Sequence, residues 1–129
     1  MARPRSFRTD PGAGTGDIDR FFAGLAGFFR TGRQPGRGCL MINSIAEDQG
    51  RGTLLGSRAQ AFRDRLNAAF ANAMAAQHEP GLVRERSQLL TAATFGIWLA
   101  ARIHPADAAR ACDATGTCIR SWHQVTGTV

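Results

Sequence analysis

The apolar residues of this chain recur at intervals of three and four, which is the spacing of amphipathic helices. The most apolar stretch predicts a helix over residues 82–104, and residues 89–101 within it carry no charged side chain. This uncharged part is too short to cross a bilayer, which takes about 20 apolar residues. Apolar residues fall on more than one face of the predicted helix. Either the helix is buried on most of its circumference within one chain, or a second molecule covers the extra face.

Four further helices are predicted from apolar stripes that lie between capping and breaking residues. They cover residues 17–31, 38–47, 57–77 and 105–123. Thr15 or Asp17 can cap the first of them, and Ser57 is a candidate N-cap for the third. The glycines that bound residues 52–56 predict a linker there. Pro105 suits the first position of the last helix, where its missing N–H is not needed.

The composition favours an all-α protein. The chain has 129 residues, enough for one domain, and it is rich in alanine and poor in β-branched residues. We predict an all-α five-helix bundle that occupies residues 17–124. A flexible basic lead-in (residues 1–16) precedes it, and a frayed tail (residues 125–129) follows it.

The net charge of +6 comes from arginine alone, because the chain contains no lysine. Most of the excess lies in the N-terminal third, at Arg3, Arg5, Arg8, Arg20, Arg30, Arg33 and Arg37. Such a charge favours an acidic partner, either nucleic acid or an acidic protein. The scattered arginines and the absence of lysine are also typical of the codon bias of a GC-rich genome. Both interpretations stay open.

Nothing in the sequence predicts an enzyme, a metal site or a cofactor. The three cysteines are odd in number, and no apolar signal segment begins the chain, so we expect a protein of the reducing cytoplasm without a disulfide framework. No cysteine or histidine spacing suits zinc. The motifs of serine hydrolases, zinc proteases and P-loop proteins are missing. Cys39 could act as a nucleophile, but its apolar surroundings favour an inert small hydrophobe.

Residues 37–43, Arg-Gly-Cys-Leu-Met-Ile-Asn, follow a Pro/Gly/Arg-rich break after a helix with paired phenylalanines. This arrangement resembles the C-terminal regulatory domain of TetR/AcrR-type bacterial transcriptional regulators, in which an R-G-C-L segment ending in Asn follows a similar turn. Residues 96–102, Gly-Ile-Trp-Leu-Ala-Ala-Arg, resemble the penultimate helix of that family. The resemblance covers about residues 17–123.

The resemblance implies a homodimer in which the last two helices of each chain form an intermolecular four-helix bundle. It also implies a small apolar effector bound between helices, which shifts the population of dimer geometries in a transcriptional repressor. Regulators of this family read DNA with an N-terminal helix-turn-helix domain, and residues 1–16 are too short to supply one. We therefore expect DNA binding only through a helix-turn-helix domain absent from this chain, and no membrane association.

The candidate site residues fall into two groups. Ligand-binding candidates are mainly aromatic, since apolar effectors sit in aromatic-lined cavities with few polar anchors. They are Phe22, Phe29, Met41, Asn43, Phe62, Leu66, Phe70 and Trp98, with Asn43 as the polar anchor. Ordinary core packing is the alternative for each of the others. The candidate dimer interface comprises Leu90, Thr94, Ile97 and Ala101 of one helix with Cys112, Gly116, Ile119 and His123 of the next. The sequence leaves open which face turns outward.

Overall fold

The computed structural model describes residues 14–31 and 53–127, and the side chains of residues 57–122 within the second range. These residues form four helices and no strand. The helices are α1 (Thr15–Thr31), α3 (Thr53–Met74), α4 (Pro80–Ile103) and α5 (Pro105–Gly127). The all-α prediction is confirmed for this part of the chain. The helix predicted over residues 38–47 lies outside the described residues, so a bundle of five helices stays a prediction.

Two predicted boundaries are wrong. Helix α3 begins at Thr53, so it includes residues 53–56 of the linker predicted over residues 52–56. Ser57 therefore lies inside the helix and does not cap it. A single glycine such as Gly56 costs a helix only about 1 kcal/mol, which neighbouring helix-forming residues can offset. Helix α5 continues to Gly127, past its predicted end at residue 123 and into the predicted tail.

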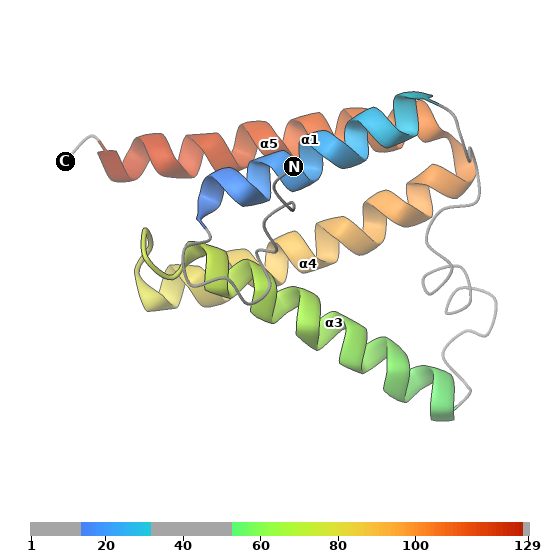
Figure 1. Cartoon of the computed structure of the whole chain (residues 1–129), viewed down its shortest axis with the longest axis horizontal. Helices are drawn as coiled ribbons and strands as arrows, with labels where there is room; N and C mark the ends of the chain where they lie inside the picture. The colour runs from blue at the N-terminus through green and yellow to red at the C-terminus, as the bar shows by residue number, and fades with distance from the viewer. Residues whose placement is uncertain (1–13, 32–52, 128–129) are drawn as a thin grey trace, which may run out of the picture.

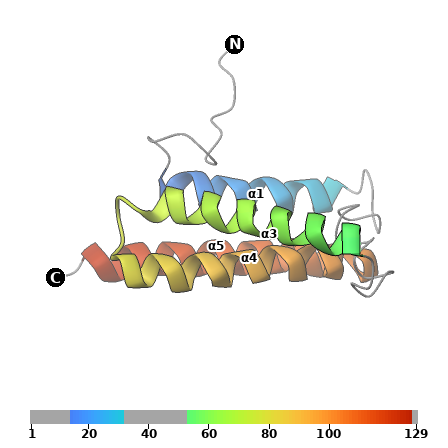
Figure 2. The ribbon, with the colours of Figure 1, turned by 90° about the horizontal axis from the view of Figure 1, so that it is seen from below.

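The four helices form two layers (Figures 1 and 2). Helix α1 runs antiparallel to α5 along most of its length, and α4 packs against both α3 and α5. Helix α3 has a smaller contact with α1. Seen from below, α1 and α3 make up one layer and α4 and α5 the other. The core lies between these layers.

Aromatic packing joins α1 to α3 at the centre of this core. The rings of Phe22 and Phe70 are stacked at 5.9 Å with an interplanar angle of 8°, and both side chains are fully buried. The ring of Phe21 meets each of them edge-on, at 5.1 and 5.9 Å. Such pairs contribute about 0.5–1.5 kcal/mol each beyond the area that they bury.

Helix α4 turns three hydroxyl-bearing residues into this core without leaving a donor unsatisfied. Ser87, Thr91 and Thr94 are at most 2% exposed. Their hydroxyls donate to backbone carbonyls one turn earlier in the helix, at distances of 2.7–3.1 Å. Because the helix itself supplies the acceptors, this face behaves as a small, nearly apolar surface.

The turn between α3 and α4 is bonded to the other helices. The side-chain Oε1 of Gln77 accepts hydrogen bonds from the backbone N–H and the hydroxyl of Thr15, at 3.0 and 2.7 Å, and so satisfies a free donor at the start of α1. Arg86 of α4 donates from Nη1 to Nδ1 of the buried His78, at 2.7 Å. The Arg86 guanidinium also lies 4.7 Å from the ring centroid of Trp122 in α5. Contacts of this turn and of Arg86 therefore reach α1, α4 and α5 at one end of the bundle.

Truncating the stacked pair tests the centre of the core. Phe70→Ala removes a fully buried ring and is expected to lower the free energy of unfolding by about 3–5 kcal/mol, the cost of a buried aromatic side chain. Urea denaturation followed by far-UV circular dichroism measures the change. Phe62→Ala is the matched control, because this ring in the same helix is only partly buried, and it should cost clearly less. Equal losses for the two variants would contradict the packing described here.

Candidate functional site

The outer side of α4 carries an apolar stripe that no described helix covers. Its large side chains are Leu89, Leu99 and Ile103, which are 54%, 40% and 87% exposed. Ala92 and Gly96 lie between them on the same face and are also exposed. We call these five residues the outer stripe. The spacing of three and four residues places them along one side of the helix.

A groove between α4 and α5 adjoins the outer stripe. Its volume is about 220 Å³, and its lining is apolar apart from a hydroxyl and a thiol. The lining residues are Leu89, Leu90, Ala93, Ala114, Thr115, Cys118 and Trp122. None of them is charged, and residues 87–101 of α4 contain no ionisable side chain. An uncharged surface of this kind is typical of the centre of a protein interface.

The residues of the predicted dimer interface lie mostly on the inner sides of α4 and α5, although Leu90 also lines the groove. Seven of its eight residues can be placed, and all seven are buried within one chain: Leu90, Thr94, Ile97, Ala101, Cys112, Gly116 and Ile119. The side chain of His123 lies outside the described residues. Leu90, Ile97, Ala101, Cys112 and Ile119 pack into the core of the chain itself, and Thr94 and Gly116 are also buried. The pairing of these residues with a second copy stays a prediction. The outer stripe and the groove are apolar parts of the surface of α4 and α5, which also exposes charged residues such as Arg102, Arg110 and Asp113.

The predicted ligand-binding residues are divided between the core and its margin. Phe22 and Phe70 form the buried stack, and Leu66 packs partly buried against the core. Phe29 meets the ring of Trp98 edge-on at 5.1 Å, and Phe62 packs against Phe95 at 5.8 Å. None of these residues lines the α4–α5 groove or the polar pocket described next. Met41 and Asn43 lie outside the described residues.

Two aromatic residues that the sequence reasoning did not select belong with this group. Phe28 is 36% exposed and lies 6.0 Å from Trp98, between ring centroids. Phe95 and Trp98 are three residues apart on α4, so they lie on neighbouring positions of one face. Partly exposed aromatic rings therefore lie where α4 contacts α1, through Phe28 and Trp98, and where it contacts α3, through Phe62 and Phe95. We call these two contacts the aromatic margin. The paired phenylalanines of α1 could have made Phe28 a candidate, but the sequence does not show that its ring would be exposed.

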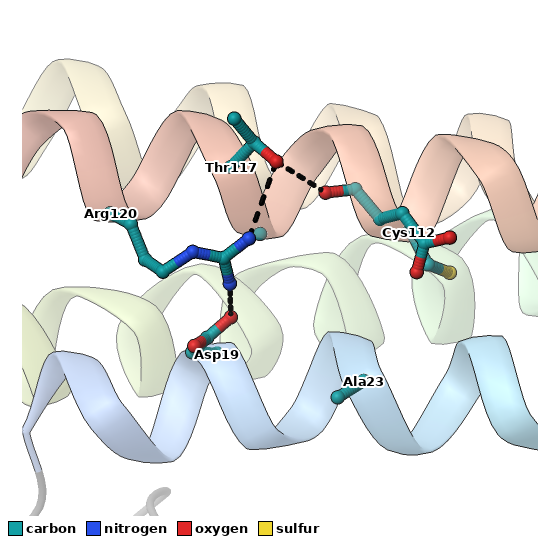
Figure 3. A pocket seen from close by; sticks show the side chains of 7 residues that line it. Asp19, Ala23, Cys112, Thr117 and Arg120 are labelled. Carbon is teal, nitrogen blue, oxygen red and sulfur yellow. Dashed lines mark hydrogen bonds and ion pairs between the residues drawn. The ribbon is translucent and has the colours of Figure 1, made fainter.

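A second pocket, of about 190 Å³, lies between α1 and α5 (Figure 3). The charged side chains that line it are already paired. Arg120 donates a hydrogen bond to Asp19 at 2.8 Å, and Asp113 forms an ion pair with Arg30 of α1. Cys112 lies in the lining, and burial raises the pKa of its thiol to about 11, so the thiol stays protonated near neutral pH. Both carboxylates of this pocket are thus paired with arginines, and its thiol is protonated.

Gly116 of α5 leaves space for the ion pair between Arg120 and Asp19, which joins α5 to α1. A Cβ atom at this position would lie 3.0 Å from Oδ1 of Asp19 and 3.2 Å from Nη1 of Arg120. The small residue thus leaves room for the paired side chains. Helix packing and ion pairs therefore explain the contact between α1 and α5.

The described arginines of the N-terminal third are also paired. Arg20 forms an ion pair with Asp17, and Arg30 forms one with Asp113. The other five, Arg3, Arg5, Arg8, Arg33 and Arg37, lie outside the described residues. The two arginines that can be described are therefore positioned by carboxylates of the chain itself.

Two further properties concern residues 14–31 and 53–127 only. No group of three or more His, Cys, Asp or Glu side chains is placed there to hold a metal ion. None of the helices formed by these residues is long and apolar enough to span a membrane.

Comparisons with protein-family models, with curated protein sequences and with solved structures find no match to this chain.

The ion pair between α1 and α5 predicts a pH dependence. The hydrogen bond and the charge of Arg30 hold the pKa of Asp113 below its ordinary value, although desolvation acts in the opposite direction. Because the carboxylate is favoured in the folded state, its contribution to stability is present above the ordinary pKa of about 3.9 and is lost as the pH falls through the lowered value. A carbon-detected NMR titration of the Asp113 carboxyl should show a low midpoint that Arg30→Gln moves upward. An unchanged midpoint in this variant would contradict the pairing.

Proposed function

We propose that this chain is the regulatory domain of a TetR-type transcriptional regulator, and that two copies pair through the outer stripe and the α4–α5 groove. The observation that carries the proposal is an apolar, uncharged surface on the two helices that pair in the resembled family. Leu89, Leu99 and Ile103 are exposed on it, whereas Leu90, Ile97 and Ala101 of the same helix already fill the core. The outer residues are thus not needed for the chain's own packing.

Physical considerations support a protein surface as the cover. Contiguous exposed apolar patches on soluble proteins mark interaction sites. Interface centres are depleted in charge, as residues 87–101 are. Ala92 and Gly96 are small, so the backbone of an apposed helix can approach closely. These features favour helix-to-helix pairing over contact with nucleic acid, which requires a basic surface.

The proposed effector site lies at the aromatic margin between α1, α3 and α4. Phe28, Phe62, Phe95 and Trp98 are each only partly buried there, so their rings have surface left for a ligand. Aromatic walls with few polar groups suit a small apolar or aromatic compound. Because α4 carries both Trp98 and the outer stripe, a ligand that favours one position of α4 would also favour one geometry of the dimer. In a regulator of this type, that geometry sets the separation of two helix-turn-helix heads.

Leu99→Arg tests the proposed pairing. An arginine in the middle of an uncharged interface would be buried without a partner, at a cost of about 3 kcal/mol, which corresponds to at least about 100-fold weaker dimerisation. Sedimentation equilibrium of both proteins over a range of concentrations measures the effect. Ala68→Arg, on the exposed side of α3, is the control and should leave the dimer intact. A wild-type chain that stays monomeric, or equal effects of the two substitutions, would contradict the pairing.

Ligand binding can be followed at Trp98 in a Trp122→Phe background, where Trp98 is the single tryptophan. A panel of small aromatic and aliphatic compounds is screened for a shift of tryptophan emission and for a rise in Tm. A ligand present at 100 times its Kd should raise the free energy of unfolding by about 2.7 kcal/mol. Phe28→Ala should weaken the binding of such a ligand without unfolding the chain, because Phe28 lies at the surface. A panel that changes neither emission nor Tm would count against the proposed effector site.

A further inference from the structure

Ile103 stands out among the large apolar side chains of the described residues. It is 87% exposed, more than any other of them, and it lies at the last position of α4. A single exposed apolar side chain is common on protein surfaces and is not by itself evidence of a contact. Its position matters because the rest of the outer stripe leads up to it along the same side of the helix.

The α4–α5 groove offers a matching recess on the same surface. Its volume of about 220 Å³ and its apolar lining suit an aliphatic side chain. For comparison, an apolar cavity of about 150 Å³ accommodates benzene. The groove lies beside Leu89, close to the N-terminal end of the stripe, and Ile103 lies at its C-terminal end. One chain thus has an apolar projection and an apolar recess at opposite ends of one stripe.

A two-fold axis through Gly96 would bring the projection of one chain to the recess of the other. Leu89 lies seven residues before Gly96, and Ile103 lies seven residues after it. At 1.5 Å per residue, each is about 10.5 Å from Gly96 along the helix axis. In a symmetric pair, residue i of one copy meets residue j of the other and the reverse also holds. Two antiparallel copies of α4 that cross at Gly96 therefore bring Ile103 of each chain to the Leu89 end of the other.

The centre of the stripe permits this crossing. A Cβ atom at Gly96 would meet nothing within 4 Å, so the backbone is open to an approaching helix. Ala93 lies three residues before Gly96, as Leu99 lies three residues after it, and Ala92 lies one residue further away. The crossing therefore sets the large Leu99 of one chain against small residues of its partner. Large residues opposite small ones are what close helix packing needs.

We infer that the two copies cross at Gly96, with Ile103 of each chain seated in the α4–α5 groove of the other. This inference rests on the proposed dimer and specifies its geometry. The seated Ile103 lies beside Cys118, an exposed free cysteine of the groove lining. Trp122 of the same lining forms part of the wall. The occupant of the groove is thus a second copy of this chain.

An engineered cysteine tests this geometry in the full chain. In Ile103→Cys, the new thiol should come within disulfide range of Cys118 of the second copy, because bridged cysteines have Cβ atoms about 3.8 Å apart. Diamide serves as the oxidant and takes up the two electrons and two protons that the paired thiols release. A covalent dimer is expected on non-reducing gels, and dithiothreitol should convert it back to monomer. Far-UV circular dichroism of the variant checks that the substitution at this exposed position leaves the helices intact.

Two controls make the crosslink specific. Ile103→Cys combined with Cys118→Ser should give at least about tenfold less covalent dimer, and so should Arg102→Cys, which places a thiol one position away on a different side of the helix. A crosslink that persists without Cys118, or one as strong from position 102, would overturn the inferred seating. A wild-type chain that sediments as a dimer while Ile103→Cys forms no crosslink would overturn the seating alone. A wild-type monomer would overturn both the seating and the proposed pairing.

Discussion

Helix α4 has apolar residues on two sides, and the helices packed against it cover only one of them. The covered side brings Leu90, Ile97 and Ala101 into the core, together with three hydroxyl-bearing residues whose donors are satisfied within the helix. Both layers of the bundle depend on this face, because α4 packs against α3 on one flank and α5 on the other. Burying the inner side therefore fixes which residues remain outside. The exposure of Leu89, Leu99 and Ile103 is a direct consequence of how the core is built.

The contacts at the two ends of the bundle differ in kind. At the turn between α3 and α4, Gln77 is bonded to the start of α1, and Arg86 is bonded to His78 and lies over Trp122. Towards the other end there are partly exposed aromatic rings, and the ion pair of Arg30 with Asp113 joins α1 to α5. Polar ties with defined geometry resist displacement, whereas loosely packed apolar surfaces can rearrange around a ligand. Under the proposed function, an effector would act at the aromatic end while the polar contacts hold the opposite end.

The sequence predicted the described helices well, because periodicity and breaking residues carry that information locally. It failed at residues 53–56, where a linker bounded by Gly56 was predicted although the helix includes these residues. It also could not assign the faces of α4. Leu90 and Ile97 are as apolar as Leu89 and Leu99, so only the packing of α1, α3 and α5 decides which pair is inside. Thr94 can be buried because its hydroxyl donates a hydrogen bond to a backbone carbonyl of the same helix. The composition of the chain does not reveal such a bond. For the ligand-binding candidates too, the sequence could not separate pocket residues from core residues. An aromatic ring can equally be a stacked core residue, as Phe22 and Phe70 are.

The central claim is that the outer side of α4 faces its own counterpart in a second chain. An isotope-filtered NOE experiment on an equimolar mixture of carbon-13-labelled and unlabelled chains tests it most directly, because only contacts between different chains give a signal. The account predicts intermolecular cross-peaks from the methyl groups of Leu99 to those of Ala92 and Ala93, and from Ile103 to Leu89. Intermolecular contacts confined to Leu90, Ile97 and Ile119, or no intermolecular contact at millimolar concentration, would contradict it.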